Sequence, residues 1–508
     1  MARTINSAKN MASSLGITLI MVFLGFITRR VFVDNVGVEY LGLNGLLQNI
    51  LGVMTLLEGG FATSVVYNMY KPLAEDDRPK ILALLQLYKK VYRWIAAGIV
   101  AFSLALYPFL DCFMKDADDL SYVSIVYFIF VFNSVVGYFT AYKWSLINAS
   151  QQVYKLTAAN LIYQVGLNLT KLAILYFTRN YILYLVVEAL FGVGLNIAIV
   201  RKANALFPFV KTGMRYQVEP LVKKGILKNM KALFINNVGG YFMHSTDNII
   251  ISSFVGVWTV GLYSNYTLLI GTVTTMVNQV LNSFSESVGN LIASEDRDKV
   301  YSVFKTVFFV NFLAASVPSV ILFNTVTPFI EWWLGKDYLL GNVTVYVILL
   351  NFYLEIMRAS AITFKVKAGI FQQDRWTPFL QGVINVVLSL WFVRMWGMTG
   401  VFIATTLSIL SIGFWQFPRL CYRHVFCQPL KKYFLTYAFY TSVAAVSLGL
   451  SVGGCHLLHF DNLFVQTVSN GVVSLLVVTL CYIIAFGKTK PFSQLLMYSR
   501  SVISRVRS

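Results

Sequence analysis

The amino-acid sequence predicts an all-α polytopic membrane protein with about fourteen transmembrane helices. Two observations lead to this fold class. Apolar residues make up 57% of the 508 residues and charged residues only 12%, whereas soluble domains contain about 45–50% and about 25%. The apolar residues also fall into blocks of about 20, the length at which a helix crosses a bilayer. This composition excludes a soluble enzyme, a disordered chain and a fibrous repeat.

Segments of about 20 residues with few charges define the candidate spans. The first is expected to be a retained helix and not a signal peptide, because its apolar run continues without a clear cleavage site. Spans longer than about 25 residues imply tilt or extension beyond the hydrocarbon. The fourteen spans are 11–33, 41–69, 82–110, 120–142, 153–177, 181–200, 229–254, 260–291, 303–328, 339–362, 376–393, 397–418, 433–454 and 463–486.

The basic residues predict the orientation of the chain. Lys and Arg number 41 against 22 Asp and Glu, a net charge of +19. They lie mainly in short loops between apolar blocks, so we attribute them to the membrane and not to nucleic acid. Because positive loops stay in the cytoplasm, both termini are expected there. Most of these residues lie on one side, in the N-terminus, 71–93, 143–155, 201–231, 297–305, 358–375, 419–432 and the C-terminal tail.

A short internal repeat suggests two related halves. Val36-Gly37-Val38 followed by Gly42-Leu43 recurs as Val255-Gly256-Val257 followed by Gly261-Leu262. Six predicted spans separate the copies, so the halves would share orientation and be related by an axis along the membrane normal, as in many transporters. The alternative is chance matching of Gly and Val in a biased composition.

Ionisable residues inside the predicted spans are candidate functional groups, because each costs roughly 2.5–3.5 kcal/mol at the bilayer centre. Lys171 and Glu188 are expected to neutralise each other across the hairpin that joins their spans. Glu355 and Arg358, three residues apart on one helix, are expected to form a local pair. Glu286 lies near the inner end of its span and is expected to reach water.

Arg29 and Arg30 have no evident acidic partner in the sequence. A guanidinium at that depth can bind a phosphate or pyrophosphate bidentately, and the alternative is a side chain that extends to the outer headgroups. Glu58 precedes two glycines deep in the second span, and Asp247 lies in a polar run of the seventh. We expect these two carboxylates to be either coupling-ion sites or partners in ion pairs within the cavity.

The sequence contains no strong motif for ATP binding or metal binding. Gly487-Lys488-Thr489 lacks the earlier glycine of a nucleotide-binding loop, so ATP is not expected to power this chain. Cys455, His456 and His459 are a weak metal pattern, and no metal or cofactor is expected. Transport coupled to H⁺ or Na⁺ therefore remains as the predicted energy source.

Several runs resemble the bacterial polysaccharide-repeat-unit flippases, the Wzx-type members of the multidrug/oligosaccharidyl-lipid/polysaccharide (MOP) exporter superfamily. The resemblance extends over the whole chain, with the most specific runs in 30–75 and 245–290. The runs are Arg30 with Val36-Gly37-Val38-Glu39-Tyr40-Leu41-Gly42-Leu43-Asn44-Gly45-Leu46, Leu57-Glu58-Gly59-Gly60, Tyr70-Lys71-Pro72-Leu73-Ala74-Glu75, Ser245-Thr246-Asp247-Asn248-Ile249-Ile250-Ile251 and Val260-Gly261-Leu262-Tyr263-Ser264-Asn265-Tyr266.

The resemblance implies two pseudo-symmetric six-helix lobes, as in the related multidrug exporters and lipid II flippases, and two further C-terminal helices. We accordingly expect an N-terminal lobe (1–208), a basic cytoplasmic connector (209–228), a C-terminal lobe (229–422), helices thirteen and fourteen (423–487) and a basic tail (488–508).

The resemblance also implies a flippase in the bacterial cytoplasmic membrane that moves undecaprenyl-pyrophosphate-linked oligosaccharide from the cytoplasmic to the outer leaflet. The polymer would be capsule, O-antigen or exopolysaccharide, and a polymerase and chain-length proteins are possible partners. By the same resemblance, Arg30, and less surely Arg29, would bind the pyrophosphate. The coupling roles of Glu58 and Asp247 are our own inference.

Two other functions stay open at the level of sequence. One is a multidrug or small-metabolite cation antiporter of the same superfamily. The other is a polytopic polysaccharide polymerase or glycosyltransferase, which usually needs a long external loop that we do not find.

Overall fold

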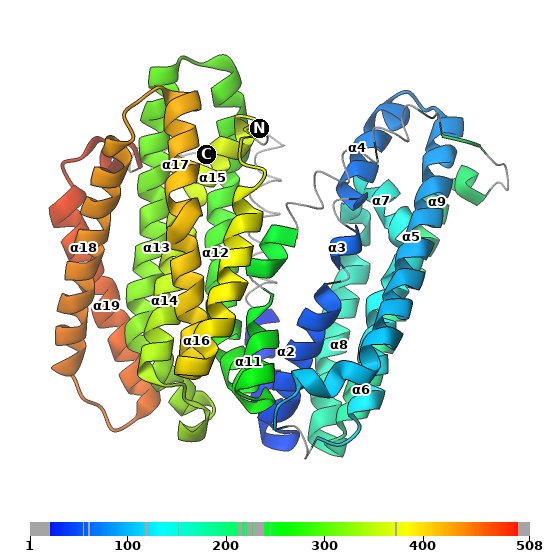
Figure 1. Ribbon diagram of the computed structural model, residues 1–508, viewed down its shortest axis with the longest axis horizontal. Helices are drawn as coiled ribbons and strands as arrows, with labels where there is room; N and C mark the ends of the chain where they lie inside the picture. Colours follow the sequence, from blue (N-terminus) through cyan, green and yellow to red (C-terminus); the bar gives the residue numbers. More distant parts are fainter. Residues whose placement is uncertain are drawn as a thin grey trace. The chain divides into compact units, whose positions relative to one another are not determined.

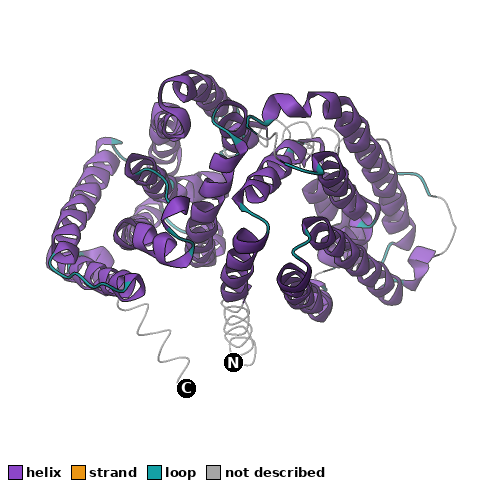
Figure 2. Cartoon of the chain, turned by 90° about the horizontal axis from the view of Figure 1, so that it is seen from below, coloured by secondary structure: helices purple, strands orange, loops and turns teal. Residues whose placement is uncertain are grey.

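The structure is a computed structural model. Every regular segment among its described residues is a helix. These residues form no strand, as Figure 2 shows. This confirms the predicted all-α fold class. The described residues are 21–53, 55–58, 61–116, 120–150, 152–211, 216–218, 220, 226, 238–243, 245–370 and 373–495.

The chain forms two compact units that meet in sequence between Gly261 and Leu262. The first, Ile17–Gly261, is called the N-terminal unit, and the second, from Leu262 onward, the C-terminal unit. Each is described by itself. Helix α12 begins in the first unit and continues into the second. The lobe boundaries expected from the sequence, with their connector at 209–228, stay a prediction.

The N-terminal unit is a bundle of long helices joined by short turns (Figure 1). Its first described segment, 21–35, is helical. Helix α9 packs against α6, α7 and α8, and α11 packs against α2. The labelled helices are α2 (Val38–Gly52), α3 (Thr55–Glu58), α4 (Phe61–Ala74), α5 (Arg78–Leu106), α6 (Val123–Val136), α7 (Ala141–Ala149), α8 (Thr157–Thr178), α9 (Tyr181–Leu206) and α11 (Asp247–Phe254), with short turns η1 (Tyr107–Phe113), η2 (Gly137–Phe139), η3 (Val153–Leu156) and η4 (Pro208–Lys211).

The C-terminal unit contains a bundle in which α13 packs against α14, α18 and α19. Phe308, Phe309 and Phe312 on α13 stack against Tyr440 on α18, and Phe309 and Phe312 also contact Phe486 on α19. Its helices are α12 (Val257–Ser294), α13 (Arg297–Trp333), α14 (Asn342–Met357), α15 (Ala359–Lys367), α16 (Thr377–Ser408), α17 (Phe414–Leu420), α18 (Lys431–His456) and α19 (Leu463–Phe486), with shorter turns η5 (Lys336–Tyr338), η6 (Ile409–Gly413) and η7 (Cys421–Phe426).

Side-chain caps start the helices where the sequence supplies them. Asp77, Asn180 and Asn462 accept backbone N–H bonds at the starts of α5, α9 and α19. These residue types satisfy the first N–H groups of a helix, which have no partner within it. The bond from the Lys80 N–H holds the pKa of the Asp77 carboxyl below its ordinary value.

The predicted spans agree with the helices that the structure describes. Within those residues, seven helices are long and apolar enough to cross a membrane, and an eighth forms if Val123–Phe139 and Ala141–Ala149, bent by 48°, are one span. These eight coincide with nine of the predicted spans, because Thr377–Phe426 covers both 376–393 and 397–418. Of the expected second span, 41–69, the structure describes α2, α3 and α4, and Met54, Gly59 and Gly60 lie outside the described residues. Spans 11–33 and 229–254 lie partly outside the described residues, so the total of fourteen stays a prediction.

The long helix α16 contains a chain reversal that separates two of the predicted spans. Gly397 has φ 56° and ψ −138°, a conformation that favours glycine. Asn385 donates to Thr405 Oγ1 at 2.9 Å, and Ser408 donates to the Gln381 carbonyl at 2.7 Å. In a straight helix these pairs would lie about 30 and 40 Å apart. The two halves therefore pack antiparallel, as expected for spans 376–393 and 397–418.

The two copies of the repeat contact each other within the N-terminal unit. A Cβ atom added at Gly42 would lie 2.0 Å from the Val257 carbonyl oxygen, and one added at Gly261 would lie 2.1 Å from the Val38 carbonyl oxygen. The second pair is the first pair with the copies exchanged. Such a reciprocal contact is the signature of a two-fold relation. The contact therefore supports the internal repeat and explains why both copies place glycine at the same position.

Candidate functional site

The two arginines of the first helix have different surroundings. Arg30 Nε donates to Asp34 Oδ2 at 2.7 Å, and both side chains are more than 40% exposed. The expectation that no acidic partner lies near these arginines was therefore wrong, because Asp34 follows Arg30 by four residues and shares its helix face. Arg29 lies close enough to Tyr184 of α9 to interact with it electrostatically.

Lys171 and Glu188 meet across the hairpin of α8 and α9. Lys171 Nζ lies 2.5 Å from Glu188 Oε2. The same ammonium lies 4.2 Å from the centroid of the Tyr184 ring, within the range of a cation–π interaction. The Lys171 side chain is 10% exposed and that of Glu188 is 38% exposed. A role of this pair in transport stays a prediction.

We call Arg29, Lys171, Tyr184 and Glu188 the Arg29 cluster. Lys171 lies seven residues before the end of α8 at Thr178, and Glu188 seven residues after the start of α9. Arg29 lies eight residues before Gly37, which precedes α2. At 1.5 Å per residue, all three lie about 10–12 Å from the same end of the unit. The fold thus brings two cations and one carboxylate to one depth from three separate helices.

Aromatic and amide side chains form the surroundings of this cluster. The Phe32 ring packs edge-on against Tyr181 and Tyr184, at centroid distances of 5.8 and 5.3 Å. The Tyr181 hydroxyl donates to the Asn44 side chain of α2, and its ring lies 4.6 Å from that of Tyr40. These contacts restrict the rotamers around the charges, which a binding site requires.

Glu58 is the last residue of the four-residue helix α3, between α2 and α4. Its carboxylate accepts a hydrogen bond from the Tyr138 hydroxyl at 3.2 Å, and the Tyr92 hydroxyl of α5 also bonds to it. An ionisable side chain inside a predicted membrane span is a candidate functional group. Glu58 therefore lies in a polar site built from three segments of the N-terminal unit.

The remaining predicted residues have other environments. Asp247 begins α11 and is 9% exposed. Glu355 and Arg358 are 3.4 Å apart at the end of α14, in the local arrangement expected from their spacing. The side chain of Glu286 lies outside the part of the structure that is described. The functional roles of these residues stay predictions.

The sequence analysis missed one buried ion pair and the tyrosines of both polar sites. Lys365 of α15 pairs with Asp374, and its ammonium lies 4.8 Å from the Phe417 ring centroid. Neither residue was singled out from the sequence, where 358–375, which contains both, was expected on the cytoplasmic side. Tyr184 precedes Glu188 by one helical turn, a spacing that the sequence alone could have indicated.

Two cavities lie at one end of the N-terminal unit. The first has a volume of about 650 Å³ and is lined by parts of α4, α7 and the segment after α9. The second has about 520 Å³, lies beside α4 and α5, and includes Lys71 and Lys80. In the described residues, no group of three His, Cys, Asp or Glu side chains has the arrangement of a metal site.

The structure resembles solved transporters over most of its length. It matches the lipid II flippase MurJ in an inward closed conformation with a TM-score of 0.69 and 14% identity, over 92% of this chain and 97% of that one. The chain therefore shares its fold with this solved transporter. An inward-facing multidrug resistance MATE family transporter gives 0.57 and 13%, over 82% and 98%. The Vibrio cholerae MATE transporter VcmN with the D35N mutation gives 0.56 and 12%, over 84% and 100%. No protein-family model matches the chain, and no curated protein matches its sequence.

Proposed function

We propose that this chain is a flippase for undecaprenyl-pyrophosphate-linked oligosaccharide repeat units in the bacterial cytoplasmic membrane. The units would be precursors of capsule, O-antigen or exopolysaccharide. Both termini would be cytoplasmic, and transport would proceed by alternating access. The fold match to a lipid II flippase over 92% of the chain supports this class, and the resemblance of the sequence to polysaccharide flippases supports this substrate.

The Arg29 cluster is the observation that favours an anionic substrate. Its described side chains include two cations, Arg29 and Lys171, and one carboxylate, which pairs with Lys171. A diphosphate carries negative charge at neutral pH and accepts bidentate hydrogen bonds from a guanidinium. Arg29 is a better candidate than Arg30 for this role, because its guanidinium lies in the cluster beside Tyr184, whereas the Arg30 side chain is 41% exposed.

The first experiment uses a strain that lacks this chain. Its lipid-linked oligosaccharides are extracted, and the leaflet that holds them is determined. The proposal predicts accumulation of complete repeat units that face the cytoplasm. Incomplete units would indicate an earlier enzyme, complete units facing outward would indicate a polymerase, and no accumulation would favour the drug exporter.

Variants of the two arginines then test the site. Arg29→Ala should abolish complementation, while Arg29→Lys should retain part of it because a single charge remains. Arg30→Ala, one residue along the chain, is the matched control and should complement. Normal transport by Arg29→Ala would refute the assignment of the diphosphate to Arg29.

Glu58 is the proposed coupling residue, because its carboxylate lies within a predicted membrane span and accepts bonds from tyrosine hydroxyls. We propose that it takes up H⁺ or Na⁺ during the cycle, with Asp247 as the second candidate. Collapse of one gradient at a time should stop transport in one case. Indifference to both gradients would leave facilitated diffusion.

A multidrug or small-metabolite cation antiporter is the second candidate. The matches to MATE transporters over 82% and 84% of the chain favour it, and Glu58 would then bind the cation. A drug-sensitivity panel on the strain without this chain distinguishes the two, since an exporter of cationic drugs should leave that strain sensitised.

A further inference from the structure

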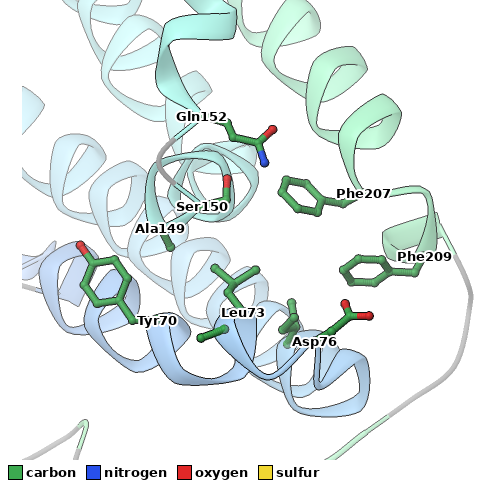
Figure 3. A pocket seen from close by; sticks show the side chains of 10 residues that line it. Tyr70, Leu73, Asp76, Ala149, Ser150, Gln152, Phe207 and Phe209 are labelled. Atoms are coloured by element: carbon green, nitrogen blue, oxygen red, sulfur yellow. The ribbon is translucent and has the colours of Figure 1, made fainter. Parts of the chain in front are cut away.

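The 650 Å³ cavity of the N-terminal unit lies away from the Arg29 cluster and has a mixed aromatic and polar lining. Its walls come from the end of α4, the end of α7 and the segment that follows α9 (Figure 3). The volume falls within the range of about 300–1,000 Å³ that is usual for small-molecule sites. These three segments fall in loops that the charge pattern places on the cytoplasmic side.

Aromatic rings form one part of the lining. Phe207 and Phe209 lie side by side at the end of α9, and Tyr70 lies across from them on α4 (Figure 3). The guanidinium of Arg78 lies 5.6 Å from the Phe209 ring centroid. The face of such a ring is electron-rich, and the C–H groups of a pyranose ring carry partial positive charge. An aromatic wall therefore suits the flat, apolar face of a sugar.

Planar polar groups and a hydroxyl form the other part. Asp76 supplies a carboxylate, Gln152 an amide and Ser150 a hydroxyl (Figure 3). The Gln152 carbonyl oxygen accepts from Lys155 at 2.7 Å, so its NH₂ group stays a donor. Ser150 donates to the Ile147 carbonyl at 2.8 Å, so its oxygen remains an acceptor. Donors and acceptors next to an aromatic wall match the hydroxyl-rich edge of a sugar.

Hydrogen bonds of the turn fix the backbone at Asp76 before any ligand arrives. Asp76 has φ 49°, in the left-handed region that Asp tolerates better than most residues. Bonds on both sides hold this turn: the Asp77 N–H donates to the Pro72 carbonyl and the Arg78 N–H to the Asp76 carbonyl, both at 2.9 Å. Arg78 Nη2 lies 3.4 Å from Asp76 Oδ2. Such preorganisation lowers the entropic cost of binding.

We propose that this cavity binds a sugar of the oligosaccharide head group on the cytoplasmic side, before the substrate enters the transport path. The aromatic wall would contact one face of the ring, and Asp76 with Gln152 would bind its hydroxyls. This inference rests on the proposed function, since it takes its ligand from the proposed substrate.

The test measures binding of a soluble glycan to the full-length chain in detergent. The probe is the repeat-unit oligosaccharide, prepared by depolymerising the surface polysaccharide of the source strain, and binding is followed by saturation-transfer NMR. Phe209→Ala and Asp76→Asn should each raise the dissociation constant by roughly two- to tenfold, as expected for loss of one aromatic contact or one charged hydrogen bond. Phe132→Ala is the matched control, because this phenylalanine of α6 is 49% exposed in the same unit and outside the cavity. It should bind like the wild type.

A second measurement tests the proposal even if the Phe209 and Asp76 variants fail to fold. A photoreactive residue at Ala74, on the exposed rim of the cavity, should crosslink to the radiolabelled glycan with every native wall in place. Absence of both binding and crosslinking in the otherwise native chain would overturn the proposal, as would equal affinity in the cavity variants and the wild type.

The results that would refute the flippase function differ from those that would refute the sugar site. If the strain without this chain accumulates no lipid-linked units while the glycan still binds at the cavity, the flippase assignment is wrong and the sugar site is retained. If the units accumulate and transport depends on Arg29 while the glycan does not bind, the sugar site is wrong and the flippase is retained.

Discussion

The reciprocal glycine contact predicts a specific and symmetric sensitivity to one added methyl group. In Gly42→Ala the new Cβ would lie 2.0 Å from the Val257 carbonyl oxygen, and in Gly261→Ala 2.1 Å from that of Val38. Ordinary van der Waals contact begins near 3.4 Å, so the two segments must separate by more than an ångström. Overpacking of this kind costs about 1–3 kcal/mol. The obstacle is backbone and not a flexible side chain, so relief by a rotamer change is excluded.

The control for this prediction is a helix glycine in open space. Gly192 of α9 has no atom within 4 Å of a built Cβ, so Gly192→Ala should gain the helix propensity of Ala over Gly, about 1 kcal/mol. The free energies of unfolding of Gly42→Ala and Gly192→Ala should therefore differ by about 2–4 kcal/mol. The assay is thermal melting in detergent, followed by size-exclusion chromatography of heated samples.

Symmetry adds a further requirement to the same experiment. Gly261→Ala should destabilise the chain as much as Gly42→Ala, and the double variant should cost less than the sum, because one methyl group already separates the contact for the other. If Gly42→Ala and Gly192→Ala have the same melting temperature, the close approach of the two backbones is refuted. If only one of the two repeat glycines is sensitive, the two-fold relation is refuted.

Three further outcomes are expected. Lys171→Met and Glu188→Gln should each lower the melting temperature, since each leaves a partly buried charge without its partner, while the double variant should recover stability without recovering transport. Asn324→Ala should cost about 1–2 kcal/mol in thermal melting, because its amide donates to hydroxyls of both α18 and α19 at 2.9 Å. A membrane-impermeant maleimide added to intact cells should label Cys112 and spare Cys427, since both are exposed but lie on opposite sides of the predicted topology.

For each of these three predictions, a different result would contradict the reasoning. Full transport by the Lys171 and Glu188 double variant would make that pair purely structural. Thr479→Ala is the control for Asn324, because Thr479 is exposed and donates only within its own helix; equal melting of the two variants would exclude an interhelical role. Labelling of Cys427 from outside would reverse the predicted orientation.

Much of the fold was predictable because the bilayer imposes a length on each apolar segment. Spans such as 303–328 and 433–454 lie within α13 and α18. The continuity of the span 41–69 stays a prediction, because Met54, Gly59 and Gly60 lie outside the described residues.

The candidate site was predictable only in part. The sequence identified Lys171 with Glu188, because a short turn between two helices places residues equidistant from it side by side. It could not place Arg29 beside Tyr184, since that contact depends on how the first helix packs against α9. It also did not single out Asp374, because no periodicity marks a loop residue that folds back onto Lys365.

Comparison of the two repeat copies distinguishes positions that are constrained by packing from positions that carry charge. At the offset that relates Gly42 to Gly261, Arg29 corresponds to Asn248 and Glu58 to Val277. The glycines agree because the close contact of two backbones leaves no room for a side chain in either copy. The charges differ, since the second copy carries Asp247 where the first has Thr28. The two copies therefore place different charges at corresponding positions, and this difference is where they would specialise for one substrate.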